Sequence, residues 1–352
     1  MVEIIRDSVK TKLTNQSTNT RSDTMKKQLV MLWIAGTVIG ILATGCNRDT
    51  TGPQDEQAPV GVTNEEGAMK YYAANDEFVK NDEATFDDQA IETMDYGTFG
   101  KIDAEITPLR FGRFIRSITR NIALTILSGD SIAIAHVEKD ITGVFKIKGV
   151  NGNGDTVIVE KPFNDKSKRN VVFKRIRKQS DRYWLNWLPV ATSLVDGGTV
   201  LPDNNPPNNK IDLTKLQLFL PNGDTITVTD PTSYYLRYRW TYLFTDGPRD
   251  IPELIGGERL RLQATVVSTS PDTDIVALRY GVGTFFKRRM RMQLVSEVNN
   301  NGTYTRVFEA PFYVHFHRGF FHAGVDAITR ATLYDDVAPY SVNWWGVPYR
   351  VF

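Results

Sequence analysis

The sequence predicts an α+β fold followed by an all-β sandwich, because the hydrophobic period changes along the chain. Between residues 63 and 80 apolar side chains can form a helical stripe, and from about Arg113 apolar and polar residues alternate as in strands. After residue 210, short strand-like segments recur with turn residues between them and without helical windows. Helices followed by a strand meander indicate α+β, and regularly spaced short strands indicate a sandwich.

The composition is that of a globular protein of 352 residues, with 42 Lys and Arg, 41 Asp and Glu and a net charge of +1. Nucleic-acid-binding proteins normally have a large basic excess, so we expect no nucleic-acid partner. The single cysteine excludes an internal disulfide and any site built from several cysteines. At this length we expect two folded domains, each with its own core.

An export signal is predicted from Met25 onward. Two lysines follow Met25, and an uncharged run from Leu29 to Gly45 ends directly before the only cysteine, Cys46. The segment 25–45 resembles a bacterial lipoprotein signal, in which small residues precede an invariant cysteine. The resemblance implies cleavage between Gly45 and Cys46 and attachment of a diacylglyceryl group to the Cys46 thiol, which would hold the mature protein on a membrane.

Two alternatives concern this N-terminal region. The uncharged run is at the lower limit of length for spanning a bilayer, so residues 25–45 can also be interpreted as a transmembrane helix. Residues 1–24 are rich in Ser, Thr, Asn and Lys, and we interpret them as a misassigned or disordered start. Cys46 is followed by Asn47 rather than Asp, which by the same resemblance implies an outer-membrane lipoprotein facing the periplasm or the cell surface.

Residues 46–63 are predicted to be a flexible tether, because they contain Pro and Gly and show no apolar periodicity. The segment Thr63–Glu66 predicts a helix start, with a capping residue and two acids in the first turn. A second acidic helix is expected from about Glu83 to Met94. Strands are then expected at 113–126, 132–137, 157–159, 171–176 and 183–188.

This order of elements resembles NTF2-like (cystatin-like) domains, in which a helix lies in the cup of a strongly curved sheet. The matching segments are the hairpin Asn121–Lys148 about Gly129-Asp130 and the closing pair Asn170–Ile176 and Arg182–Pro189 with Trp184. The resemblance implies an NTF2-like domain over residues 64–195, whose cup can house an active site.

Residues 196–210 are the predicted linker, because glycines, prolines and asparagines dominate them. Residues 211–352 then resemble an immunoglobulin-like β-sandwich domain. Its expected hairpin turns lie at Pro221–Asp224 and Asn300–Gly302. The cysteine pair usual in such domains is missing, so the core must depend on packing alone.

Four histidines are candidates for chemistry. His315 and His317 share one face if they lie on a strand, and with His322 they form a candidate metal site. The alternative is a pair of half-exposed histidines on a strand. His136 shares its parity with two isoleucines and is a candidate base inside the NTF2-like cup, or else a satisfied core or rim histidine.

Alternate residues from Tyr234 to Phe244 are mostly aromatic. Tyr238, Trp240 and Tyr242 form a candidate platform for sugar rings, and the alternative is the inner face of the sandwich. Two basic clusters, at residues 166–178 and 287–291, are interpreted either as a face for anionic envelope polymers or as charged strand edges.

The sequence lacks a nucleophile elbow, a phosphate-binding loop, a dinucleotide fingerprint and a zinc-protease helix. We therefore expect a non-catalytic protein without a cofactor. The preferred hypothesis is a lipid-anchored cell-envelope protein that acts as a binding or structural module for a protein or glycan partner. The alternatives are an enzyme that uses the NTF2-like cup and a carbohydrate-binding lipoprotein.

Overall fold

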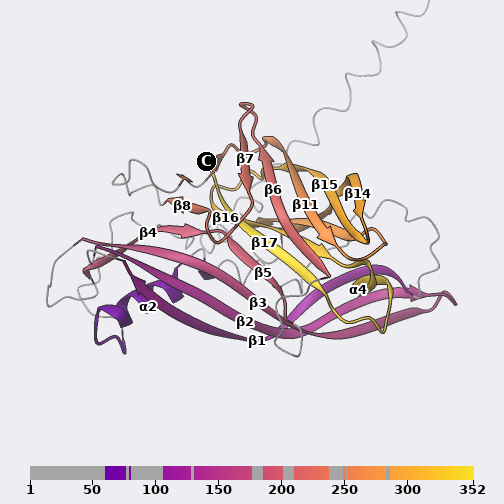
Figure 1. Ribbon diagram of the computed structural model, residues 1–352, viewed down its shortest axis with the longest axis horizontal. Coiled ribbons are helices and arrows are strands. Elements are labelled where there is room, and N and C mark those ends of the chain that lie inside the picture. Colours follow the sequence, from indigo (N-terminus) through magenta and orange to yellow (C-terminus); the bar gives the residue numbers. More distant parts are fainter. Residues whose placement is uncertain are drawn as a thin grey trace, which may run out of the picture. The chain divides into compact units, whose positions relative to one another are not determined.

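β-Strands make up most of the regular structure in the computed structural model of this chain (Figure 1). The structure describes residues 60–76, 79–80, 106–127, 131–176, 185–200, 210–237, 249–250, 252–282 and 286–352. Within these ranges there are seventeen strands and two helices. Residues 57–352 belong to one compact unit. Neither helix of the described ranges combines the length and the apolar character needed to cross a membrane.

The predicted fold class is therefore wrong. Helix α2 (Glu65–Asn75) covers one end of three long strands, and the sheet that these strands begin continues into the C-terminal half of the chain. Residues 64–195 consequently do not form an α+β NTF2-like domain. Residues 211–352 do not form a separate immunoglobulin-like sandwich either, because one of the two facing sheets is shared with the preceding strands.

Helix α2 begins where the sequence predicts a helix start. The Asn64 side chain accepts a hydrogen bond from the Gly67 amide at 2.7 Å, and two acidic residues occupy the first turn. One of them, Glu65, accepts hydrogen bonds from Arg175, Asn186 and Trp187, which ties the helix to the neighbouring strands. Ala68, Met69 and Ala73 are the buried residues of the helix.

Three strands of 20 or 21 residues form an antiparallel meander, namely β1 (Ile106–Ile126), β2 (Ile132–Asn151) and β3 (Thr156–Arg175). The sequence predicts shorter pieces here, because the polar residues 164–170 interrupt the apolar pattern of β3. In the structure these residues remain in register with β2, and several of their side chains are buried and hydrogen-bonded. Paired polar groups therefore extend the strand where apolar alternation fails.

Strands β1, β2 and β3 belong to a twelve-stranded sheet, which continues from the second edge of β3. Strand β3 pairs with β4 (Trp187–Ser193) and with β5 (Val195–Thr199), and β5 also pairs with β17 (Val342–Val351). The remaining strands of this sheet are β8 (Tyr235–Arg237), β9 (Arg249–Asp250), β10 (Glu253–Leu254), β12 (Ile275–Val282), β13 (Phe286–Arg291) and β16 (Gly319–Ile328).

Strand β5 lies partly within residues 196–210, the segment expected as a linker. A Cβ atom at Gly197 would lie 2.2 Å from Cε2 of Trp344, so this glycine permits close contact with the indole ring. The sequence cannot distinguish this use of glycine from a flexible linker. Residues 201–209 lie outside the described ranges, and the large sheet continues across the predicted domain boundary.

A five-stranded sheet faces part of the large one. Its order is β14 (Gln293–Asn300), β15 (Thr303–Tyr313), β11 (Arg259–Ser268), β6 (Ile211–Phe219) and β7 (Thr225–Val228). Both predicted hairpin turns are confirmed, and Gly223 and Gly302 adopt φ values of 89° and 87°. Residues of both sheets share one core cluster, so the sheets pack face to face.

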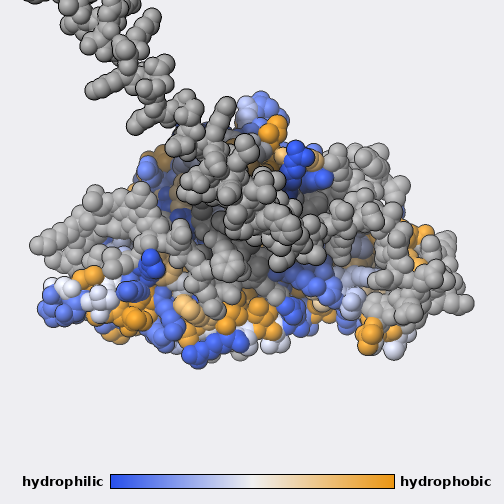
Figure 2. Space-filling view, turned by 180° about the vertical axis from the view of Figure 1, so that it is seen from behind, coloured by the Kyte–Doolittle hydropathy of each residue, from blue (hydrophilic) through white to orange (hydrophobic). Residues whose placement is uncertain are grey.

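Two further core clusters lie on the long meander. One buries α2 against β2 and β3, and the other buries α4 (Arg330–Tyr334) against β1, β2 and β3. Away from these clusters, hydrophilic and hydrophobic residues are interleaved along the lower surface of the view in Figure 2, where the long strands lie. Among the described residues, the core between the two sheets is the largest of the three clusters.

Candidate functional site

An apolar cavity lies inside the sandwich, and we call it the sandwich cavity. Its volume is about 40 Å³. Its lining residues are Leu194, Leu216, Leu218, Ile226, Val228, Tyr234, Leu236, Pro252, Leu254, Leu262, Leu278, Phe312, Ala323, Val325, Val347 and Tyr349. Strand alternation positions these side chains, since members of one strand, such as Ala323 and Val325 of β16, are two residues apart.

Some residues that line the sandwich cavity are less buried than the rest, and we call the side of Pro252 and Val347 its mouth. Leu218, Ile226, Tyr234, Pro252 and Val347 are half-buried, and the other lining residues are buried. In the described residues, the outer edge of β17 pairs with β5 at 343–346 and with β10 at 350–351. Among the described residues, Val347 therefore lies in the interval between these two pairing partners of β17.

The lining side chains of the sandwich cavity carry only two polar atoms, the hydroxyls of Tyr234 and Tyr349. The Tyr349 hydroxyl lies 3.1 Å from Nε2 of His315 and shares a hydrogen bond with it. Burial, and to a smaller extent the charge of His317, lowers the pKa of His315 below its ordinary value of 6.5. At neutral pH His315 is therefore an uncharged partner that engages the tyrosine.

Next to this histidine, three exposed apolar residues form what we call the loop patch: Ile255, Phe316 and Phe352. Phe316 is 81% exposed and Ile255 is 62% exposed. The Phe316 ring lies against the turn at Gly256 and Gly257, and a Cβ atom at Gly257 would come within 2.9 Å of it.

The backbone of the loop patch is well bonded. The Gly257 amide donates to the Val314 carbonyl at 2.8 Å, and the Phe352 amide donates to the Leu254 carbonyl at 3.2 Å. The patch therefore displays large apolar side chains from a hydrogen-bonded turn.

The three histidines of the candidate metal site do not converge. The ring centroids of His315 and His317 are 6.0 Å apart. His315 packs edge-on against Phe321 with ring centroids 4.1 Å apart, and the next residue of that strand, His322, points to the opposite face. In the part of the chain that the structure describes, no group of three or more His, Cys, Asp or Glu side chains is arranged to hold a metal ion.

Several predicted sites lie outside the described residues. These are the cleavage site at Gly45, the lipidation site at Cys46 and the aromatic residues Tyr238, Trp240 and Tyr242. They stay predictions. The two described residues that share the parity of the aromatic row, Tyr234 and Leu236, both face the sandwich cavity rather than solvent.

His136 lies on the half-buried face of β2, and not on the face that forms the core. The opposite face carries Ala133, Ala135 and Val137, which pack against α2. His136 Nδ1 lies 2.8 Å from Asn170 Oδ1, and its Nε2 lies 3.1 Å from the Thr125 hydroxyl. Both faces of β2 contain apolar residues, so parity alone does not identify the core face. In the described residues, the sheet that α2 covers continues into the C-terminal half of the chain, so it is not the separate NTF2-like domain that the enzyme hypothesis assumes.

The two basic clusters do not form uniform faces. In β3, Lys168 is exposed, whereas Arg169 is buried on the other face. Arg175 pairs with Glu65 at 3.0 Å and lies over the Trp187 ring. In β13, the buried Arg289 donates to the Phe111 carbonyl at 2.9 Å. Some of these basic side chains are therefore exposed, and others are buried or paired with groups of the protein itself.

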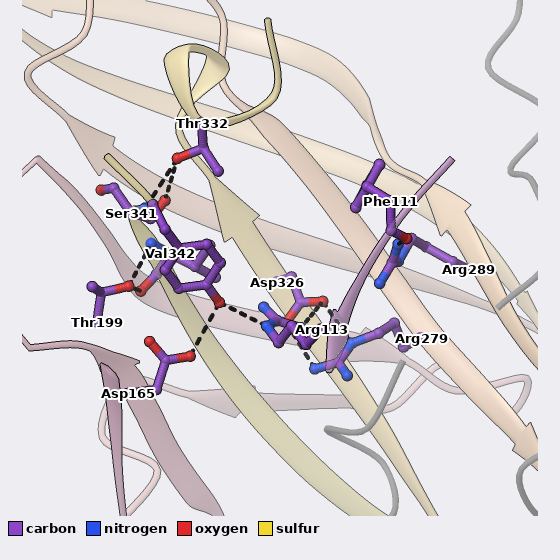
Figure 3. A network of polar contacts seen from close by, with 11 residues as sticks. Phe111, Arg113, Asp165, Thr199, Arg279, Arg289, Asp326, Thr332, Ser341 and Val342 are labelled. Carbon is purple, nitrogen blue, oxygen red and sulfur yellow. Dashed lines mark hydrogen bonds and ion pairs between the residues drawn. The ribbon is translucent and has the colours of Figure 1, made fainter. Parts of the chain in front are cut away.

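A buried charge network joins the long meander to the sandwich (Figure 3). Arg113 of β1 donates to both carboxylate oxygens of Asp326, at 3.4 and 3.3 Å, and Arg279 of β12 donates to Asp326 at 2.8 Å. Arg113 also donates to the Tyr340 hydroxyl at 2.6 Å, and this hydroxyl donates to Asp165 at 3.1 Å. Two arginines and two carboxyl groups thus share one buried region.

Burial is the main cause of the shifted pKa values of Asp165 and Tyr340 in this network. It raises the pKa of Asp165 from 3.8 to about 6, although the Arg113 guanidinium and the Tyr340 hydroxyl lower it. It also raises the pKa of Tyr340 well above its ordinary value, so the phenol keeps its proton and can donate it. The network is enclosed, which suits a structural role better than contact with a ligand.

No protein-family model, curated protein or solved structure matches this chain. The features of this chain that bear on its function are therefore the sandwich cavity, the loop patch and the predicted anchor. Sequence patterns did not identify the first two. The aliphatic parity of β6, β16 and β17 gave a signal for a core, but a gap inside a core depends on how side chains from several strands meet.

Proposed function

We propose that this chain is a lipid-anchored cell-envelope protein that acts as a binding module for a protein or glycan partner. The lipoprotein-like signal ending at Cys46 supports the anchor, and Asn47 supports an outer-membrane location facing the periplasm or the cell surface. The loop patch supports the binding role, because Phe316 and Ile255 expose apolar surface on a hydrogen-bonded turn.

The loop patch has the chemistry of a recognition surface. Aromatic side chains carry much of the binding energy in interfaces, and arginines often accompany them. Here the guanidinium carbon of Arg350 lies 4.5 Å from the centre of the Phe352 ring. A partner that covers Phe316 would remove its exposed ring from water without requiring the turn to rearrange.

The anchor can be tested by metabolic labelling with a palmitate analogue in a bacterial host. The full chain should incorporate the label, and the Cys46→Ser variant should incorporate none. Label retained by Cys46→Ser, or no label in the unchanged chain, would contradict the lipid anchor.

The binding surface can be tested with a photo-crosslinking residue at position 316 of the full chain in cells. We expect a discrete adduct that an Ile255→Asp substitution abolishes. Position 337 is a matched control, because Val337 is 85% exposed but does not belong to the loop patch. The same adducts from both positions, or none from position 316, would contradict the loop patch as the binding surface.

A further inference from the structure

We propose that the sandwich cavity binds an unbranched hydrocarbon chain, such as that of a fatty acid or a single-chain lipid. This inference goes beyond the proposed function, since it concerns the interior of the sandwich rather than the loop patch. It also does not depend on the lipid anchor at Cys46.

The lining chemistry points to a hydrocarbon ligand. Apart from the hydroxyls of Tyr234 and Tyr349, the lining side chains consist of carbon and hydrogen only. The Tyr349 hydroxyl is already engaged by His315. A polar ligand would lose its hydrogen bonds to water on entry and regain few inside, which opposes its binding. A hydrocarbon chain has no such cost, and it gains dispersion contacts with the walls.

The size of the sandwich cavity agrees with partial insertion of a chain. Its volume of about 40 Å³ is roughly three times the minimum of about 10–15 Å³ that one water molecule needs. Water is nevertheless a poor occupant, because it needs two or more polar partners and the walls offer almost none. A short stretch of methylene groups fits this space better, and the remainder of the chain can continue through the mouth.

One small residue keeps the sandwich cavity open. Ala323 of β16 lies directly opposite Val347 of β17 in the strand register, and both line the cavity. Leucine or valine at position 323 would extend into the space and improve the packing of an otherwise aliphatic core. Alanine leaves room beside the mouth, where a ligand chain can enter between Val347 and Pro252.

Binding can be measured with the fluorescent fatty acid cis-parinaric acid. The protein is the full chain in a Cys46→Ser background without detergent, so that no attached lipid competes. We expect saturable binding of one probe per chain. Ala323→Leu should weaken it by about tenfold or more, because the new side chain occupies the space of the ligand.

Two variants complete the experiment. Ala123→Leu makes the same change on the exposed surface of β1 and should leave probe binding unchanged. Val347→Phe narrows the mouth from the opposite strand and should weaken binding as Ala323→Leu does, which keeps the proposal testable if one variant fails to fold.

Competition then distinguishes the two sources of the chain. Displacement by dodecanoate alone indicates a free fatty acid, and displacement by lauroyl lysophosphatidylcholine indicates a chain that carries a phospholipid headgroup. Absence of saturable probe binding would overturn the proposal. Equal affinity in folded Ala323→Leu, folded Val347→Phe and the unchanged chain would also overturn it.

Discussion

The two faces of β12 and β16 present opposite solutions to burial. On one face, Leu278 and Val325 line the sandwich cavity. On the other, the adjacent residues Arg279 and Asp326 belong to the charge network. The same backbone thus separates an apolar interior that contains open space from an ionic interior in which the Asp326 carboxylate is shared by two guanidinium groups.

This difference indicates which contacts fix the arrangement of the strands and which tolerate changes of side chain. Buried charges require defined partners, so the network fixes how β1 and β3 meet β12 and β16. Apolar contacts are non-directional, so the cavity face accepts changes in side-chain volume more readily. Substitutions on adjacent residues of one strand can test this contrast directly.

The largest effect is expected for Asp326→Asn. The substitution removes the buried negative charge that Arg113 and Arg279 share. The free energy of unfolding in urea should fall by about 3–5 kcal/mol. Asp155→Asn, at an exposed turn, is the control and should change it by less than about 0.5 kcal/mol. Equal losses in both variants would mean that the network does not hold the two regions together.

A pH-dependent effect is expected from Asp165 of the same network. Its pKa is about 6 in the folded protein, above its ordinary value of 3.8, so the folded state binds this proton more tightly than the unfolded state. The stability that it contributes is fully present below about pH 4 and is lost as the pH rises through 6.

Asp165→Asn should therefore gain stability relative to the unchanged chain as the pH rises from 4 to 7. The expected gain is of the order of 2–3 kcal/mol. Urea denaturation of both proteins at a series of pH values measures the difference in their unfolding free energies. The contributions of the other carboxyl groups are the same in both proteins and cancel in this difference. A difference that does not change with pH would exclude Asp165 as the titrating group.

A smaller effect should separate the adjacent residues Ala323 and Gly324. A Cβ atom at Gly324 would lie 3.3 Å from Nη2 of Arg279, so Gly324→Ala must displace the guanidinium and should cost about 1–2 kcal/mol. Ala323→Leu enters the sandwich cavity and should change the unfolding free energy by less than about 1 kcal/mol. If the leucine variant loses more stability than the alanine variant, the contrast between the faces is wrong.

The smallest effect is expected for Tyr349→Phe, which removes the hydroxyl that engages His315 and keeps the ring in the cavity wall. The melting temperature should fall slightly, corresponding to about 0.5–1 kcal/mol. Tyr313→Phe is the matched control, because Tyr313 is 44% exposed and should show no change. A large loss of stability in Tyr349→Phe would mean that the hydrogen bond to His315 is a major contribution to the stability of the apolar face.

Local sequence signals identified several elements correctly. Asn64 and the acids after it predicted the start of α2, and the asparagine and glycine residues of the turns before β7 and β15 predicted both hairpins. These succeed because caps and tight turns depend on neighbouring residues. The sequence also excluded a disulfide framework, and it predicted an anchor at Cys46 that awaits its test.

Tertiary structure decided the rest, because the decisive contacts join residues far apart in the chain. The polar middle of β3 remains in the strand because Asp165 accepts a hydrogen bond from the Tyr340 hydroxyl. Gly197 lies in a strand because its missing side chain leaves room for the Trp344 ring. The sequence alone does not show which face of β2 is buried, because the buried face is the one that α2 covers. Neither the sandwich cavity nor the charge network can be read from spacing, because each exists only where distant strands meet.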